Sequence, residues 1–309
     1  MRVLVTGGAG FIGSHIVLRL LRDGHAVRVL DNFTTGKREN LAEARGEVEI
    51  IEGDVRDPAA VERAIVGTEV VFHQAAIVSV PYSVEHPVET HDVNIEGTLN
   101  VLLAARAAST RRVVFASSAA IYGEEPTLPK TEAMLPAPIS PYGVEKLASE
   151  HYLRCFTHLH GLETVALRYF NVFGPRQDPS SPYSGVISVF ASRIQAGRTV
   201  GIFGDGEQTR DFVYVGNVVE ANLRASSAPA ASGNVYNVAC GAQTTLLDLA
   251  ARIARAAGKP HTVEHLPPRA GDIRHSLADI SRARRDLGYE PVTGLDEGLV
   301  QLLSYAPPR

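Results

Sequence analysis

A glycine-rich turn near the start of the chain constrains the fold more than any other feature. Residues 3–13 read VLVTGGAGFIG, so Gly7, Gly10 and Gly13 recur at every third position after a β-branched run. Glycines at this spacing permit a tight turn, close approach of the backbone to a pyrophosphate, and close packing of helix on strand. The N-terminus of the next helix, at Phe11 and Ile12, supplies N–H groups and a favourable dipole. The turn predicts a strand–turn–helix unit that binds a dinucleotide.

The rest of the first 170 residues repeats this alternation of strand and helix. Such a pattern predicts βαβ units, right-handed crossovers and an α/β fold with a doubly wound parallel (Rossmann) sheet. Runs that are apolar on both faces agree with a sheet covered by helices. We expect strands at 2–6, 26–31, 48–52, 70–74, 113–117 and 164–168, and helices at 12–23, 59–65, 95–108 and 143–160.

The character of the chain changes after Gly174, where residues 174–186 are rich in Pro, Ser, Gly and Asp. We predict a dinucleotide-binding domain at 1–173 and mainly a smaller α/β substrate lobe at 174–309. Segments 211–217 and 235–238 are candidates to return to the first domain. Further elements are expected at 200–203, 218–225, 246–257, 263–265 and 281–287.

Composition excludes several classes of function. A net charge of −4 does not suggest binding to nucleic acid or to a membrane surface. Apolar runs stay well short of the roughly 20 residues that span a bilayer. Cys155 and Cys240 are far apart, which favours a reducing cytoplasm, and the sequence contains no Cys/His cluster with metal-ligand spacing, so no metal is expected.

Acidic residues at strand ends indicate which dinucleotide is bound. Asp31 ends the second strand about 20 residues after the glycine turn, where a carboxylate can accept a hydrogen bond from the adenosine ribose. Its charge would repel a 2′-phosphate, which favours NAD over NADP, although Lys37 and Arg38 can offset that repulsion. Asp54 ends the third strand and can reach the adenine.

A second constellation suggests proton-transfer chemistry. Tyr142 and Lys146 are four residues apart just after Pro141, so both lie on one face at the start of a helix. A nearby ammonium and a cationic nicotinamide would lower the pKa of the phenol. Ser117 and Ser118 follow the fifth strand, where ligands gather in open α/β sheets. Ser118 can hydrogen-bond the same substrate hydroxyl and relay its proton.

Taken in order, these and other motifs resemble the extended short-chain dehydrogenases/reductases of the nucleotide-sugar epimerase and dehydratase group. The resemblance covers essentially the whole chain. It rests on the segments TGGAGFIG (6–13), HQAA (73–76), SS (117–118), PYGVEK (141–146), RYFNVFGP (168–175) and RDFVYV (210–215).

The resemblance implies a reaction and its site residues. Tyr142 takes a proton from a sugar hydroxyl at C4, hydride moves to a tightly held NAD, and the flat 4-keto sugar turns before both return. Beyond the residues named above, it implies cofactor contacts at Asn32, Gly36, Val55, Gln74, Ala75, Ala76, Asn94, Tyr169 and Val172. It implies substrate contacts at Ser79, Asn171, Arg210, Arg269, Asp272 and Ser276, with the two arginines on a diphosphate and Asp272 on the nucleoside ribose. It also implies that Val186, Ile187 and Phe190 border the uracil, although core packing explains these three nearly as well.

Departures from the group's patterns narrow the reaction. Dehydratases of the group carry an Asp–Glu pair after the hydroxyl residue, whereas Ala119 and Ala120 follow Ser118 here. Glucuronate epimerases and decarboxylases of the group need a cation or several hydroxyls to bind the C6 carboxylate of the sugar. Loop 77–83 has no cation, so that alternative is weaker and stays open. A 4-epimerase of UDP-hexoses is the prediction. In the group's 4-epimerases the residue at the position of Ser276 borders the sugar. Because serine is small, this position leaves room for N-acetylated sugars as well as the plain ones.

Two further expectations concern the class of function and the oligomeric state. A non-catalytic NAD-binding protein and a net dehydrogenase that releases NADH are the competing functions. The resemblance implies a homodimer in which helices 92–108 and 143–159 form a four-helix bundle with their copies. Partial apolar stripes support that bundle but suit packing on the sheet equally well: Ile95, Leu99, Leu102, Leu103 and Leu147.

Overall fold

A seven-stranded parallel sheet forms the centre of the structure, in the order β11-β6-β5-β4-β1-β2-β3. The computed structural model describes residues 1–178, 185–268 and 273–305. The expected doubly wound α/β fold is confirmed, and each predicted strand of the first domain agrees to within one residue at either end. The strands are β1 (Arg2–Thr6), β2 (Ala26–Asp31), β3 (Val48–Glu52), β4 (Val70–His73), β5 (Arg112–Ser118), β6 (Glu163–Tyr169) and β11 (Asn234–Val238).

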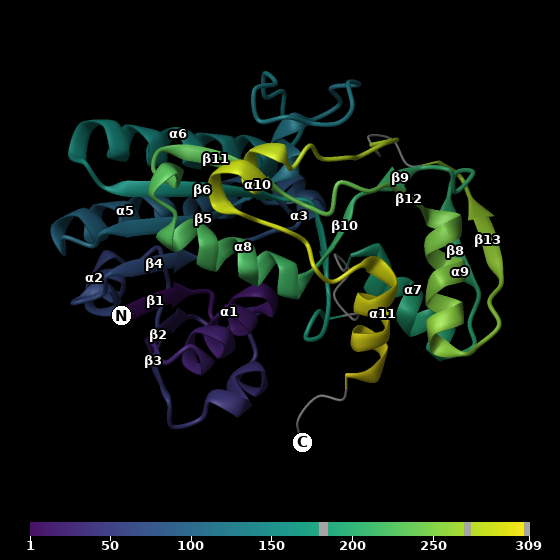
Figure 1. Ribbon diagram of the computed structural model, residues 1–309, viewed down its shortest axis with the longest axis horizontal. Coiled ribbons are helices and arrows are strands. Elements are labelled where there is room, and N and C mark those ends of the chain that lie inside the picture. The colour runs from purple at the N-terminus through teal and green to yellow at the C-terminus, as the bar shows by residue number, and fades with distance from the viewer. Residues whose placement is uncertain (179–184, 269–272, 306–309) are drawn as a thin grey trace.

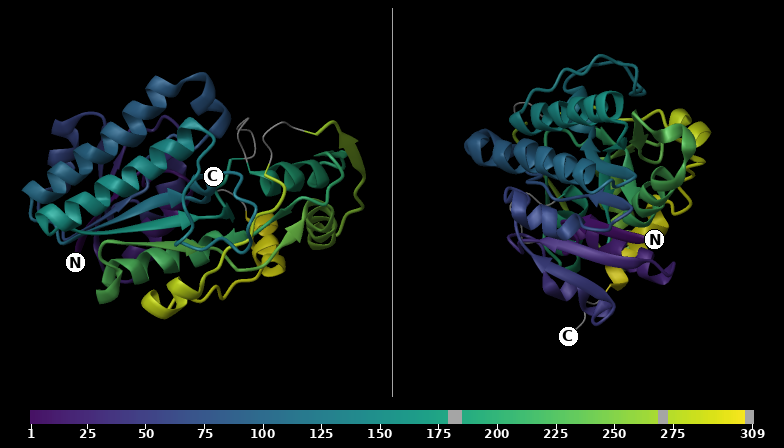
Figure 2. Two further views of the ribbon diagram at one scale, coloured as in Figure 1. Left: turned by 90° about the horizontal axis from the view of Figure 1, so that it is seen from above. Right: turned by 90° about the vertical axis from the view of Figure 1, so that its left-hand side faces the viewer.

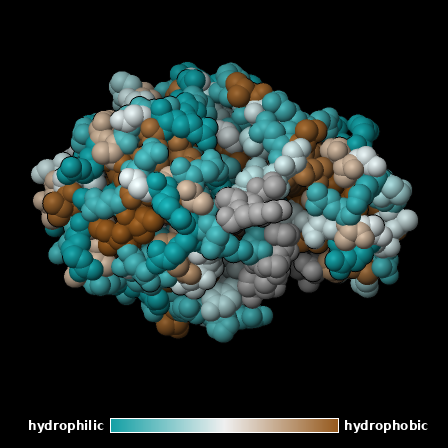
Figure 3. All heavy atoms as spheres, turned by 90° about the horizontal axis from the view of Figure 1, so that it is seen from below, coloured by the Kyte–Doolittle hydropathy of each residue, from teal (hydrophilic) through white to brown (hydrophobic). Residues whose placement is uncertain are grey.

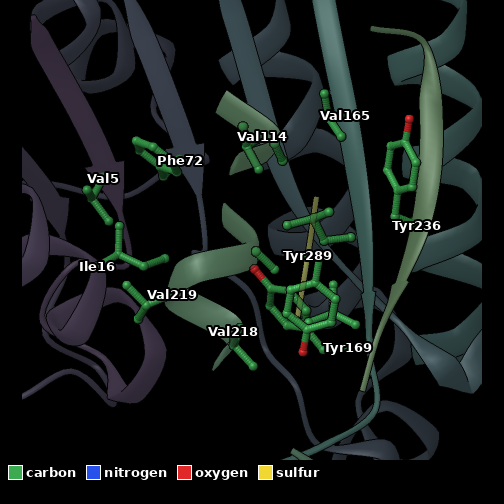
Figure 4. Packing of buried hydrophobic residues seen from close by; sticks show 14 of the residues in the cluster. Val5, Ile16, Phe72, Val114, Val165, Tyr169, Val218, Val219, Tyr236 and Tyr289 are labelled. Atoms are coloured by element: carbon green, nitrogen blue, oxygen red, sulfur yellow. The ribbon is translucent and has the colours of Figure 1, made fainter. Parts of the chain in front are cut away.

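Helices cover both faces of this sheet, which explains why its strands are apolar throughout. One face packs against α1 (Phe11–Arg22), α8 (Val215–Ser227) and α10 (Ser281–Leu287), and the other against α2 (Pro58–Ile65), α5 (Gly97–Ala107) and α6 (Pro141–His160). Alternate residues of a strand point to opposite faces. Val5 therefore belongs, with Ile16 and Val218, to the first core (Figure 4), while Leu4 belongs to the second.

A smaller group of elements lies beside the sheet (Figure 1) and has its own core around Phe173, Phe190 and Leu249. It contains α7 (Val186–Gln195), β8 (Val200–Phe203), α9 (Leu246–Ala257), β13 (Val263–Leu266) and α11 (Leu295–Ser304). Two short strand pairs connect it to the large sheet: β7 (Asn171–Phe173) with β10 (Phe212–Tyr214), and β9 (Thr209–Arg210) with β12 (Thr244–Thr245).

The chain crosses between these two groups several times after residue 174. Segment 235–238 returns to the large sheet as β11, which pairs with β6. Segment 211–217 does not join that sheet, because β10 pairs with β7. Segments 218–225 and 281–287, which we expected in the lobe, are α8 and α10 and pack on the large sheet. Their apolar faces fill the first core, a contact that sequence order does not reveal.

Short helical turns surround the larger elements. They are η1 (Arg38–Ala44), α3 (Val80–Glu85), α4 (Pro87–His91), η2 (Asp92–Glu96), η3 (Ala119–Tyr122) and η4 (Pro229–Ala231). In Figure 2, α5 and α6 run side by side on the outside of the sheet. The face in Figure 3 is mostly hydrophilic, with apolar residues in separate patches. Among the described residues, no helix combines the length and the hydropathy needed to cross a bilayer.

Candidate active site

The glycine turn leaves a cradle that only glycine backbone can form. Gly7 has φ +66°, and a Cβ there would lie 2.7 Å from the backbone nitrogen of Ala75. A Cβ on Gly13 would lie 2.1 Å from the carbonyl oxygen of Gly7. The turn therefore packs directly on the first turn of α1, which begins at Phe11 after Gly10. Such a cradle, at a helix N-terminus, fits the pyrophosphate of a dinucleotide.

Asp31 and the glycine turn come together as predicted. Asp31 ends β2 with its carboxylate buried, and it accepts hydrogen bonds from the backbone nitrogens of Ala9 (2.9 Å) and Phe33 (2.8 Å). A Cβ on Gly36 would lie 2.7 Å from one carboxylate oxygen of Asp31. A backbone loop thus closes over the carboxylate, at the strand end where an adenosine ribose would bind.

Lys37 and Arg38, the two cations that could offset repulsion of a 2′-phosphate, pair with carboxylates of the protein. The Lys37 ammonium lies 2.6 Å from the Asp178 carboxylate. Arg38 pairs with Glu52 and stacks 4.0 Å from the centre of the Phe33 ring. Both charges are therefore partly neutralised within the protein, which supports NAD over NADP.

Asp54 and its neighbours extend the same edge of the sheet. Asp54 pairs with Arg56 at 2.8 Å and accepts a hydrogen bond from the Asn32 side chain at 2.8 Å. The Arg56 hydrogen bond is the main cause that lowers the pKa of Asp54 to about 2. Asp54 is therefore ionised at neutral pH. Val55 is buried in the second core, where a Cβ on Gly97 would lie 2.6 Å from it.

Tyr142, Lys146 and Ser118 meet where β5 ends and α6 begins. Pro141 is the first residue of α6 and the Ser140 side chain caps it, so Tyr142 lies in the first turn as predicted. The phenol is 7% exposed and forms a hydrogen bond with Ser118, whose hydroxyl also accepts from the backbone nitrogen of Ala120. Ser118 is thus both the cap of η3 and a partner of Tyr142.

The electrostatics of Tyr142 differ from the expectation. Burial raises the pKa of its phenol to about 12; the Ser118 hydrogen bond lowers it and the Glu145 charge raises it further. Lys146 donates to the carbonyl of Ala116 at 2.8 Å, and its ammonium is 5.8 Å from the centre of the Tyr142 ring. The protein groups alone therefore do not lower the phenol pKa, because desolvation outweighs the hydrogen bond.

Lys146 has an unusual environment of its own. It is 2% exposed, and burial lowers the pKa of its ammonium to about 8, while Glu145 and Glu150 raise it. Its ammonium also lies 4.7 Å from the centre of the Phe115 ring. Near neutral pH the side chain is mostly a cation, and it is close enough to its pKa for small changes in charge to matter.

Three predicted cofactor residues use their side chains for contacts within the protein. The Ser117 hydroxyl donates to Glu150 at 2.5 Å. The Tyr169 hydroxyl lies within hydrogen-bond distance of two acceptors, the side-chain oxygens of Gln74 (3.2 Å) and Asn222 (3.1 Å). Asn94 binds the backbone of Ile77 through its oxygen at 2.8 Å and its nitrogen at 2.9 Å. Cofactor contacts at Ser117 and Tyr169 would therefore come from the backbone.

The remaining predicted cofactor residues frame the same strand ends. The Ala75 nitrogen donates to the Thr6 hydroxyl at 3.3 Å, and half-buried Ala76 follows it. Thr6 also contacts His73 at 2.7 Å, and the other ring nitrogen of His73 contacts Thr98 at 3.0 Å. Burial lowers the pKa of His73 to about 3, so its ring is neutral. Val172 packs between the first core and that of the lobe.

On the substrate side, the structure brings Asn171, Arg210 and Ser276 to one region. The Asn171 nitrogen donates to the carbonyl of Asp211 at 3.1 Å, and the Ser276 nitrogen donates to that of Thr209 at 3.1 Å. Both contacts flank Arg210 along the chain. Ser79 caps α3 by accepting from the Tyr82 nitrogen at 3.1 Å. Arg269 and Asp272 lie outside the described residues.

The predicted uracil border is mainly core. Ile187 and Phe190 are 2% and 3% exposed and belong to the core of the smaller lobe, while Val186 packs at its edge. Sequence reasoning assigned no role to Glu150 or Arg168, which form a buried ion pair beside Ser117. Glu150 follows Tyr142 and Lys146 at the same four-residue spacing, and that spacing is the signal that could have found it.

Comparisons with known proteins agree with this geometry. The model of the NAD dependent epimerase/dehydratase family matches residues 3–239. The chain is similar to a UDP-glucose 4-epimerase of Thermotoga maritima with UDP-glucose (41% identity, 99% of this chain and 98% of that one, TM-score 0.94). It is similar to a UDP-N-acetylglucosamine 4-epimerase of Methanobrevibacter ruminantium in complex with UDP-N-acetylmuramic acid (41% identity, 98% of this chain and 96% of that one, TM-score 0.93). It is also similar to a Thermus thermophilus UDP-glucose 4-epimerase in complex with NAD (44% identity, 98% of each chain, TM-score 0.90).

Proposed function

The chain belongs to the NAD-dependent epimerase/dehydratase family, and from that premise we propose that it is an NAD-dependent 4-epimerase of UDP-hexoses. The observation that carries the proposal is the meeting of Tyr142, Ser118 and Lys146 at the strand ends beside the glycine cradle. Similar enzymes named for this reaction span almost the full length of the chain.

The residues present fit NAD. The cradle of Gly7 and Gly13 would receive the pyrophosphate, and the Asp31 carboxylate would accept from the adenosine ribose. NAD held there would supply the acceptor, and later the donor, of the hydride at C4 of the sugar. Tyr142 and Lys146 would border the nicotinamide end, because α6 packs on β5 and β6, which β4 and β1 separate from β2 and its Asp31 in the strand order.

The chain's own groups then handle the proton. Ser118 holds the C4 hydroxyl, and Tyr142 accepts its proton as the C4–H bond breaks, which leaves a 4-keto sugar. After the sugar turns over, Tyr142 returns the proton to the new C4 oxygen. Lys146, a cation near neutral pH, stabilises the phenolate against the burial that raises its pKa. Ala119 and Ala120 offer neither acid nor base, so the site does not support elimination of water.

The substrate side is assigned by matching motifs. We propose that Arg210 and Arg269 hold the diphosphate, Asp272 the nucleoside ribose, Asn171 the phosphate side of the sugar, and Val186 the edge of the uracil. The position of Arg210 between the two backbone contacts at Thr209 and Asp211 supports the first of these roles. Guanidinium groups suit phosphate oxygens because they form paired, charge-assisted hydrogen bonds.

Product analysis tests the function directly. The purified protein is incubated with UDP-glucose, UDP-galactose and their N-acetyl forms, without added cofactor, and products are identified by NMR. We expect interconversion at C4 without net production of NADH. Stoichiometric NADH release would instead indicate a dehydrogenase, and absence of any conversion would leave a non-catalytic NAD-binding protein.

Ser276 sets the sugar specificity in this proposal. Ser276 is half-buried next to β9, and its small side chain leaves room beside the sugar. We expect Ser276→Tyr to abolish turnover of the N-acetylated pair and spare the plain pair, because the phenol ring occupies the space of the acetyl group. Coupled assays with both pairs measure this, and Ser227→Tyr, at an exposed position of α8, is the matched control. Equal loss of both activities would contradict the proposed role of Ser276 in sugar specificity.

A homodimer through α5 and α6 is the proposed assembly. Leu102 packs in the second core, whereas Leu103 is 40% exposed. Along α6 the exposed apolar residues Val144, Tyr152 and Leu159 recur at helical spacing. Adjacent α5 and α6 can therefore present an apolar face to a second copy (Figure 2). Sedimentation equilibrium of the purified chain distinguishes dimer from monomer.

A further inference from the structure

A buried ion pair connects α6, the helix that carries Tyr142 and Lys146, to β6. Glu150 of α6 and Arg168 of β6 are 5% and 4% exposed, and they form two hydrogen bonds of 3.0 and 2.8 Å. Burying two charges is costly unless further hydrogen bonds satisfy them. Here the Ser117 hydroxyl donates to Glu150 at 2.5 Å, and Arg168 donates to the Tyr122 hydroxyl at 2.9 Å. A pair this well supported can fix the structure around it.

The pair completes a series of contacts between β5 and α6. Ser118 bonds Tyr142, the Ala116 carbonyl accepts from Lys146, and Ser117 donates to Glu150. Tyr142, Lys146 and Glu150 are four residues apart, so one face of α6 makes all three contacts.

We propose that Glu150 is a positioning residue for the reaction. Its carboxylate, anchored by Arg168, holds the Ser117–Ser118 end of β5 against α6 and balances the charge of Lys146. The expected effect on kcat rests on the proposed function, whereas the structural and charge roles of Glu150 do not depend on it.

The charge role follows from what surrounds Lys146. On α6 it faces Tyr142 and two carboxylates, those of Glu145 and Glu150. From β4 it faces His73, which is neutral. From β6 the nearest cation is Arg168, which Glu150 binds.

Of the two carboxylates, Glu145 already accepts from Thr90 at 2.6 Å and from Asn94 at 2.7 Å. Without the Glu150 charge, both burial and the unpaired Arg168 would disfavour the Lys146 cation. The phenolate of Tyr142 would then lose its counter-charge at a lower pH.

The chain allows this to be measured directly, because it has only four lysines: Lys37, Lys130, Lys146 and Lys259. Their side-chain carbons can be titrated by NMR, with Lys146 assigned from Lys146→Arg. We expect Glu150→Gln to lower the measured pKa of Lys146 by about 1, the effect of losing one close opposite charge. The upper limit of the pH profile of kcat should move to lower pH by the same amount, with KM for the UDP-sugar little changed.

A matched control exists on the same two strands. Arg112 and Glu163 pair at 2.8 Å at the start of β5 and β6, opposite the end that carries Ser117 and Arg168. Glu163→Gln should alter thermal stability but leave both the Lys146 titration and the pH profile unchanged. Ser117→Ala, which keeps the Glu150 charge, should lower kcat without moving the pH limit.

The outcomes separate the inference from the proposed function. If Glu150→Gln leaves the Lys146 titration where it is in the wild type, Glu150 has only a structural role and the inference is overturned. If the wild type converts no UDP-sugar, the proposed function fails, while the lysine titration still decides the charge role of Glu150.

Discussion

Replacing Tyr142 with phenylalanine is expected to reduce kcat by roughly 10²–10⁴-fold, the usual contribution of a general acid–base group. The variant loses the phenol oxygen that bonds Ser118 and accepts the proton, so the C4 hydroxyl keeps its proton and no hydride can leave. The ring still fills the same buried space, so NAD content and UDP-sugar affinity should be retained. NMR of the product mixture and the absorbance of reduced nicotinamide measure the loss, and no transient NADH signal should appear.

Tyr289→Phe is the matched control for this change. Its hydroxyl is also buried and donates to the Ala239 carbonyl at 2.9 Å, but it lies against α10 in the first core. The control should lose about 1 kcal/mol of unfolding free energy and keep its kcat. A Tyr142→Phe enzyme that retains wild-type turnover would remove Tyr142 from the mechanism.

The second large effect is expected at the glycine cradle. In Gly13→Ala the new Cβ would lie 2.1 Å from the Gly7 carbonyl oxygen, and both are backbone positions that cannot move independently. α1 must shift away from the turn, which distorts the cradle that would receive the pyrophosphate. We expect the purified variant to contain little NAD and to lose about 1–3 kcal/mol of stability from overpacking.

Gly294→Ala separates this steric effect from a general cost of changing glycine near a helix start. Gly294 precedes α11 with φ −75°, as Gly10 precedes α1, and a Cβ there would meet nothing within 4 Å. Bound NAD is quantified after denaturation, and stability by thermal unfolding. Full NAD content in Gly13→Ala would show that the close contact does not shape a cofactor site.

Much of the fold was predictable because it depends on local patterns. β-Branched runs and glycine turns specify strands and their ends, and the bounds of α9 (Leu246–Ala257) and α10 (Ser281–Leu287) are those expected from the sequence. Where those helices pack was not predictable. α10 joins the large sheet and α9 the smaller lobe, since packing depends on which apolar surface lies uncovered after the sheet has formed.

The candidate site shows the same division. The four-residue spacing placed Tyr142 and Lys146 on one face of α6, and the strand ends brought Ser118 and Asp31 to the same edge of the sheet. The direction of the Ser117 hydroxyl was not visible, because its partner Glu150 is 33 residues away. The direction of the shift in the phenol pKa was also not predictable, since it depends on how deeply Tyr142 is buried.

By itself, the sequence determined the glycine turn, the alternation of strands and helices of a doubly wound sheet with its acid at Asp31, and the pairing of Tyr142 with Lys146, because each follows from spacing along a strand, turn or helix. The tertiary structure alone decided that Glu150 of the same helix forms a buried ion pair with Arg168. It also decided that burial lowers the pKa of Lys146 to about 8, and that Ile187 and Phe190 belong to a hydrophobic core. Charges and burial depend on residues that are distant in the chain and meet only when the sheet and its helices pack.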